Sequence, residues 1–111
     1  MEFWGYSRPD GSVGGRNPVL ILPATRNVNY ICPRIALAVP GVTTFYTTGE
    51  YGRTGGDRKR LARFLTGIAR NPNVANVLLI GMPHGYGYPE FQTDALAAEI
   101  AKSGTRLEVL N

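Results

Sequence analysis

The stretch PVLILP, residues 18–23, decides the fold of this chain. It is an almost unbroken run of Val, Leu and Ile, and NVLLIGM at residues 76–82 has the same character. Strands that are covered on both faces have this composition, whereas strands with one face in water alternate apolar and polar residues. The two runs therefore predict a parallel sheet with helices on both faces.

Two weaker apolar runs, VTTFY at 42–46 and RLEVL at 106–110, complete the predicted sheet. Between them, GDRKRLARFLTGIARNP at 56–72 is typical of a helix with one buried face. Asp57 is its predicted N-cap, and Asn71-Pro72 is its predicted end. Its apolar residues recur at spacings of three and four: Leu61, Phe64, Leu65 and Ile68.

Two more helices are predicted. YPEFQTDALAAEIAKSG, residues 88–104, has Pro89 at a suitable first helical position and Gly104 at a suitable C-terminal stop. We expect its Leu96 and Ile100 to face the sheet. NYICPRIALAVPG, residues 29–41, predicts a shorter helix, because its proline must lie in the first turn.

The predicted order is β-α-β-α-β-α-β, which indicates an α/β, Rossmann-like fold. We expect a four-stranded parallel sheet with strand order 2-1-3-4 and helices on both faces. Residues 1–17 are predicted to form an irregular, glycine-rich N-terminal arm, and residues 18–111 a single α/β domain.

The composition is that of a globular protein, with 43% apolar and 18% charged residues in a chain of 111. No apolar run approaches the roughly 20 residues that cross a bilayer, and the N-terminus does not resemble a secretory signal. Cys32 is the only cysteine, which rules out an intrachain disulfide and suits a reducing compartment. We predict a cytoplasmic protein with no membrane contact.

The net charge of +4 is compatible with nucleic acids or with small anions as partners. Many of the basic residues fall within the helix predicted at 56–72, where a charge run is typical of a solvated face. No aromatic residues alternate with them, so we predict no nucleic-acid binding.

Parallel sheets bind ligands beyond the carboxyl ends of their strands, and three loops leave that edge here. They are ATRN at 24–27, TTGEYGRTGG at 47–56 and PHGYGYPE at 83–90. Glycine-rich loops allow backbone N–H groups to approach a ligand, and each loop leads to a helix N-terminus suited to anions.

Several side chains in these loops are candidate site residues. Arg26 and Arg53 have the geometry to clamp a carboxylate, and Glu50 and His84 are candidate proton-transfer residues. Glu50 is also a candidate metal ligand. Ordinary roles as exposed loop residues, or a structural role for the lone histidine, are the alternatives. The predicted substrate-binding set adds Asn27, Thr48 and Tyr86.

Arg16 and Asn17 enter the first strand from its opposite end. They would contact a substrate only if the glycine-rich arm folds over, or through a neighbouring domain or subunit. Otherwise they anchor the arm by hydrogen bonds to backbone carbonyls. Motifs for other chemistries are absent: no P-loop, no dinucleotide fingerprint, no closed zinc site and no nucleophile elbow occur.

Two stretches resemble the altronate/galactarate dehydratases, a family that includes the large subunit of sulfolactate sulfo-lyase. LTGIARNPNVANVLLIG at 65–81 resembles a helix that ends in Ala-Arg-x-Pro-Asn before a strand. The opening matches the pattern Gly-Tyr-x-Arg-x-Asp-Gly-x-x-Gly-x-Arg-Asn at Gly5, Tyr6, Arg8, Asp10, Gly11, Gly14, Arg16 and Asn17.

The resemblance implies a hydro-lyase that removes water, or sulfite, from an acidic polyhydroxy substrate with a divalent, iron-type metal. The chain departs from the family where its thiol and metal-binding side chains usually stand. Asn27, the segment Thr48–Gly52 and the segment Pro83–Gly85 replace them. We therefore expect either a catalytic-region fragment or a divergent stand-alone member.

The alternative is a non-catalytic module that binds a small anion or pairs with another subunit. Both possibilities imply a homo-oligomer or contacts with further domains.

Overall fold

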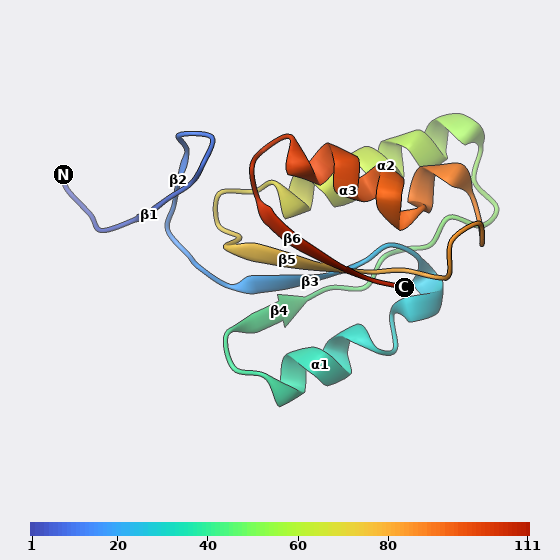
Figure 1. Ribbon diagram of the computed structural model, residues 1–111, viewed down its shortest axis with the longest axis horizontal. Helices are drawn as coiled ribbons and strands as arrows, with labels where there is room; N and C mark the ends of the chain where they lie inside the picture. The colour runs from blue at the N-terminus through green and yellow to red at the C-terminus, as the bar shows by residue number, and fades with distance from the viewer.

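The computed structural model describes all residues, Met1–Asn111. Four parallel strands form one sheet in the order β4-β3-β5-β6, which confirms the predicted order 2-1-3-4 (Figure 1). Each strand is close to its predicted position, although two of them end earlier. The bounds are β3 Val19–Pro23, β4 Val42–Thr44, β5 Asn76–Ile80 and β6 Arg106–Leu110.

Helices cover both faces of the sheet, as the apolar strands predict. The helix α1 lies on one face, and α2 and α3 lie side by side on the other (Figure 1). Two short 3-10 segments precede α1 and α3. The bounds are η1 Arg26–Val28, α1 Cys32–Ala38, α2 Gly55–Ala69, η2 Pro89–Phe91 and α3 Thr93–Ala101.

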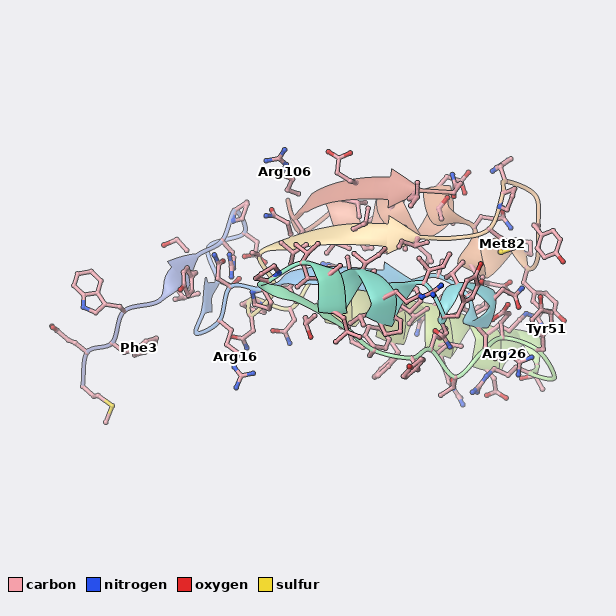
Figure 2. The ribbon with its side chains drawn as sticks, turned by 90° about the horizontal axis from the view of Figure 1, so that it is seen from below. Phe3, Arg16, Arg26, Tyr51, Met82 and Arg106 are labelled. Atoms are coloured by element: carbon pink, nitrogen blue, oxygen red, sulfur yellow. The ribbon has the colours of Figure 1, made fainter.

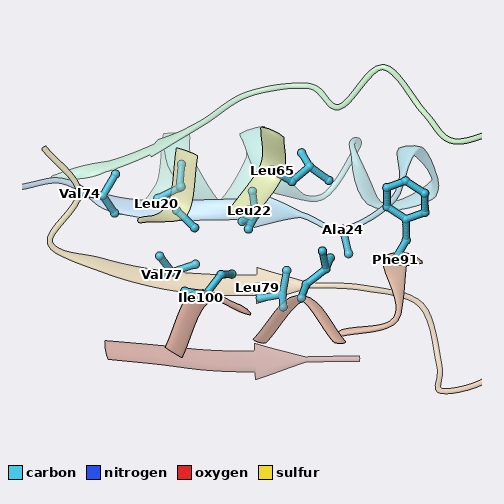
Figure 3. Packing of buried hydrophobic residues seen from close by; sticks show 11 residues of the cluster. Leu20, Leu22, Ala24, Leu65, Val74, Val77, Leu79, Phe91 and Ile100 are labelled. Carbon is cyan, nitrogen blue, oxygen red and sulfur yellow. The ribbon is translucent and has the colours of Figure 1, made fainter. Parts of the chain in front are cut away.

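Alternate residues of the central strands enter two separate cores. Leu20 and Leu22 of β3 belong to the larger core, beneath α2 and α3 (Figure 3). Ile21 belongs to the smaller core, against α1. Leu65 of α2 and Ile100 of α3 are fully buried against the larger core. Each such side chain stabilises the fold by about 1.5–3 kcal/mol, which explains why these strands need apolar residues at every position.

The start of α2 differs from the prediction. Thr54, not Asp57, is the N-cap, and its Oγ1 accepts a hydrogen bond from the backbone N–H of Asp57 at 3.2 Å. A threonine three residues before an acidic residue is a known capping pattern, and Asp57 then faces the positive end of the helix dipole. Phe64, predicted to lie in the core, is 60% exposed, because the buried stripe of α2 runs through Leu65 and Ala69.

The start of α3 also differs. Pro89 begins η2 rather than α3, and Gln92 has an extended conformation (φ −64°, ψ 139°) that separates the two segments. The predicted stop is confirmed, because Gly104 has a φ of +75° just after the helix. Leu96 and Ile100 are buried as expected.

The N-terminal arm contains a small antiparallel hairpin of β1, Tyr6–Ser7, and β2, Val13–Gly14. Arg8 ties this hairpin to the domain by donating to Pro72 O at 2.7 Å, to Asn17 Oδ1 at 3.0 Å and to Arg16 O at 2.8 Å. Residues before the hairpin extend away from the sheet, as Phe3 shows in Figure 2. None of the helices is both long enough and apolar enough to cross a membrane.

Candidate functional site

The loops that follow β3, β4 and β5 meet at one edge of the sheet. Arg26, Tyr51 and Met82, one residue from each loop, lie at the same end of the molecule (Figure 2). Arg16 and Arg106 lie at the opposite end (Figure 2). We call the first end the carboxyl edge and the second the amino edge.

Glu50 is the most unusual residue at the carboxyl edge. It is only 1% exposed, its Oε2 accepts one long hydrogen bond from the backbone N–H of Arg26 at 3.5 Å, and its Oε1 has no partner within the chain. The hydroxyls of Thr25 and Thr47 are also buried without a partner. Buried polar atoms without partners are costly and rare, and they often mark functional positions.

Two arginines flank the segment that carries Glu50. Arg53 donates to Gly49 O at 2.7 Å and to Thr48 Oγ1 at 2.9 Å. Gly49 has a φ of +92°, and a Cβ added there would lie 3.1–3.2 Å from the side chain of Arg26. A glycine is therefore required for this turn and for the close approach of Arg26. The structure thus brings together four of the candidate residues, Arg26, Thr48, Glu50 and Arg53, but not His84, which was expected to join them.

A chain of arginine–tyrosine contacts links the three loops. The Arg26 guanidinium lies 5.7 Å from the ring centroid of Tyr51, and the rings of Tyr51 and Tyr88 are 6.1 Å apart. The guanidinium of Arg58 lies 4.2 Å from the Tyr88 centroid. Such contacts are favourable when a cation lies within about 6 Å of an aromatic face. These four residues, the arginine–tyrosine ladder, hold the loops against one another.

Arg58 is a residue of this edge that the sequence pattern assigned to a solvated helix face. It also donates to Arg53 O at 2.9 Å and lies 3.5 Å from Glu90. Its side chain is only 20% exposed. Its position in the first turn of α2 could have identified it as a residue of this edge, because helices that follow parallel strands begin at the carboxyl edge.

Two asparagines join the first loop to the second. Asn29 exchanges two hydrogen bonds with the backbone of Thr47, at 2.9 and 3.1 Å. Asn27 donates to the Tyr51 hydroxyl at 3.3 Å. Asn27 therefore lies close to the other predicted residues, while Asn29 fixes the spacing of the two loops.

His84 and Tyr86 lie on the third loop, away from this cluster. The His84 side chain is 78% exposed, and its Nδ1 lies 4.0 Å from Asp94 Oδ2. Tyr86 is 55% exposed, and its backbone carbonyl accepts a hydrogen bond from Gln92 Nε2 at 2.7 Å. Neither residue contacts Glu50 in this structure. Arg16 and Asn17 lie at the amino edge, held by Arg8.

The residues of this chain do not by themselves fit an iron-type metal centre. No group of three or more His, Cys, Asp and Glu side chains is arranged to hold a metal ion. Cys32, the first residue of α1, lies in the smaller core, where burial raises the pKa of its thiol and disfavours the thiolate that metals bind.

The carboxyl edge is closed in this conformation. Four cavities occur in the molecule, and none of them is lined by Arg26, Glu50 or Arg53. A ligand can therefore reach the buried carboxyl group only if the loop around residues 47–54 moves.

Comparison with known proteins adds a family likeness. A family described as D-galactarate dehydratase/Altronate hydrolase, second domain, matches residues 5–111. The chain is 38% identical over 86 residues to the (2R)-sulfolactate sulfo-lyase subunit beta of Chromohalobacter salexigens. That alignment covers 76% of this chain and 22% of the relative, so the chain spans about a fifth of the relative's length. No solved structure matches the chain.

Proposed function

Because the chain belongs to the D-galactarate dehydratase/altronate hydrolase family, as a second-domain member, we propose that it is a domain of a sugar-acid hydro-lyase. It binds an acidic polyhydroxy substrate at the carboxyl edge of its sheet. The buried Glu50, with one unpartnered oxygen between two arginine-bearing loops, carries this proposal.

The reaction of such a lyase requires a base beside a cationic surface. A proton leaves the carbon next to the substrate carboxylate, and the carboxylate then carries additional negative charge. The hydroxyl on the neighbouring carbon departs with a proton from an acid, and water is released. The atoms balance because the base takes one proton and the acid supplies one.

Glu50 is the proposed base, because its free oxygen is a proton acceptor held in a dry environment. Arg26 and Arg53 bind the substrate carboxylate and stabilise the developing charge, since a guanidinium pairs with a carboxylate through two hydrogen bonds. Thr48 and Asn27 are placed to bind hydroxyl groups.

His84 is the proposed acid, with Tyr86 beside it on the third loop. Both side chains are exposed and would turn towards Glu50 as the substrate orders the loops. Arg16 and Asn17 would enter this site only from a neighbouring copy or domain, because they lie at the opposite edge (Figure 2, Arg16).

The second candidate is a non-catalytic module that binds a small anion or pairs with another subunit. The closed carboxyl edge and the lack of a metal-ligand cluster favour it. In that case Arg26 and Arg53 retain an anion-binding role, and Glu50 performs no proton transfer.

We also propose that the chain works within a larger assembly in the cytoplasm. The related sulfo-lyase chain is named as a subunit, and it is several times longer than this chain. Phe3 and Trp4 are 75% and 101% exposed, which is unfavourable for a side chain that meets only water. Because Trp4 is the only tryptophan, a blue shift of its fluorescence with rising protein concentration would report its burial against a second copy.

Turnover assays with galactarate, altronate and (2R)-sulfolactate, accompanied by metal analysis, test the proposal. We expect turnover that Glu50→Gln abolishes and that Glu108→Gln, a change at an exposed strand residue, leaves intact. Binding of a sugar acid without turnover would favour the module. Neither binding nor turnover with any of the three acids would contradict the lyase proposal and the anion-binding module, and would leave the subunit-pairing module.

A further inference from the structure

A polar cavity lies at the amino edge, at the opposite end of the sheet from the loops described above (Figure 2). Its volume is about 220 Å³, and only two of its 15 lining residues are hydrophobic. Three separate segments form its walls: the N-terminal hairpin at 7–12, the turn after α2 at 70–76 and the turn after α3 at 103–106.

Tight backbone packing holds these walls in place. A Cβ added to Gly104 would lie 2.8 Å from Pro9 Cβ, so the hairpin rests directly on the turn after α3. On the other side, Arg8 donates to Pro72 O at 2.7 Å. The cavity is therefore defined by the fold and does not depend on flexible side chains alone.

Positive charge predominates in this cavity. Arg8, Arg70 and Arg106 line it, with Asp10 as the one carboxylate. The Arg8 guanidinium is already bonded to the backbone and to Asn17, but neither Arg70 nor Arg106 forms an ion pair within the chain. Two guanidinium groups are thus available to a ligand.

The Asp10 carboxylate forms its hydrogen bonds with Ser12 of the same hairpin. Both the hydroxyl and the backbone N–H of Ser12 donate to its Oδ1, and these bonds lower the pKa of the Asp10 carboxyl below its usual range. Asp10 therefore stays charged at neutral pH and offsets part, but not all, of the positive charge that the three arginines bring.

We propose that this amino-edge cavity binds a small oxyanion with two negative charges, either a phosphate or a short dicarboxylate. Paired hydrogen bonds from Arg70 and Arg106 recognise both classes, and the volume admits a molecule of that size but not a nucleotide. The site is independent of the lyase activity proposed for the carboxyl edge. The competing hypothesis is that the two arginines only offset the negative ends of helix dipoles.

Isothermal titration of the full chain with inorganic phosphate, and separately with malate, tests the proposal. We expect one binding site, with Arg106→Gln and Arg70→Gln each weakening affinity about tenfold. Asp10→Asn should strengthen affinity, because it removes the one opposing charge. Arg34→Gln, which removes an exposed arginine on α1, is the matched control and should leave affinity unchanged.

The anion that binds with the higher affinity identifies the ligand class. The absence of binding by both anions would overturn the proposal, and so would equal weakening by Arg34→Gln, which would indicate attraction to net charge. Chemical-shift changes confined to residues of the cavity would support it. Thermal melting of each variant shows whether a loss of binding is caused by unfolding. It also tests the helix-dipole hypothesis, because only that hypothesis requires Arg70→Gln to lower the melting temperature.

Discussion

The two edges of the sheet are built by different means. At the amino edge, residues of the two family-like stretches meet through hydrogen bonds between side chains and backbone: Arg8 donates to Pro72 O, and the Gly15 N–H donates to Asn73 Oδ1 at 2.8 Å. At the carboxyl edge, contacts between arginine and tyrosine side chains also join the loops, and Glu50 Oε1 and two threonine hydroxyls are buried without partners. The buried polar side-chain atoms of the amino edge all have hydrogen-bond partners, whereas several of those at the carboxyl edge do not.

This difference separates the residues that identify the family from those proposed to act on substrate. The opening motif holds the arm and the turn after α2 in place, which is a folding role. The carboxyl edge carries the buried polar groups without partners that stability alone would disfavour. Mutation of a stabilising residue is expected to lower the free energy of unfolding, whereas mutation of a functional residue is expected to raise it.

The largest effect is expected at Gly14. A Cβ at this position would lie 2.0 Å from Pro72 O, so Gly14→Ala must displace the hairpin or the turn after α2. We expect the free energy of unfolding, measured in urea, to fall by about 3 kcal/mol. Gly15→Ala is the matched control, because its Cβ would meet only Asn73 Oδ1 at 3.8 Å. Equal losses in both variants would contradict the close packing at Gly14.

A smaller loss is expected at Arg8. Arg8→Met keeps the aliphatic stem but removes three hydrogen bonds, to Pro72 O, Asn17 Oδ1 and Arg16 O. Because this side chain is partly buried, we expect a loss of about 2 kcal/mol in the same urea titration. Arg16→Met, at an exposed position, should change stability by less than about 0.5 kcal/mol. A larger loss of stability in Arg16→Met than in Arg8→Met would show that Arg8 is not the residue that holds the hairpin to the domain.

At the carboxyl edge we expect a substitution to raise the free energy of unfolding instead of lowering it. Glu50→Gln replaces a carboxylate that is only 1% exposed and that has one oxygen without a partner. We expect the free energy of unfolding to rise by about 1 kcal/mol while turnover of the sugar acid is lost. If Glu50→Gln instead destabilises the chain as Gly14→Ala does, Glu50 belongs with the structural residues.

The smallest effect is expected at Tyr51. Tyr51→Phe removes the hydroxyl that accepts from Asn27 at 3.3 Å in an exposed position, but retains the ring of the arginine–tyrosine ladder. We expect the free energy of unfolding to change by less than about 0.5 kcal/mol. Tyr51→Leu, which removes the ring, should lower the free energy of unfolding by a larger amount. Identical melting curves for the two variants would show that the ladder does not hold the loops.

The fold was largely predictable because a continuous apolar run as short as residues 18–23 suits a strand that is covered on both faces. The strand order matched the expectation, but the sequence did not determine it, because right-handed crossovers are compatible with several strand orders. Helix starts were harder to place: Asp57 and Thr54 are both good caps, and the choice depended on how far the loop before α2 extends. The exposure of Phe64 reflects a buried stripe shifted by one residue.

The candidate site was predictable in location but not in its contacts. Arg26, Glu50 and Arg53 meet because the carboxyl ends of parallel strands always meet, which is a property of the topology. The burial of Glu50, the role of Arg58 and the separation of His84 depend on how three loops pack together. No local sequence pattern encodes such packing between distant segments.

The decisive experiment for a substrate site at the carboxyl edge is amide chemical-shift mapping during titration with galactarate. We expect changes concentrated at residues 25–29 and 47–54, with the amino-edge cavity unaffected. Changes confined to residues 7–12, 70–76 and 103–106 would contradict this site, because substrate would then bind at the edge assigned here to folding and to a second anion.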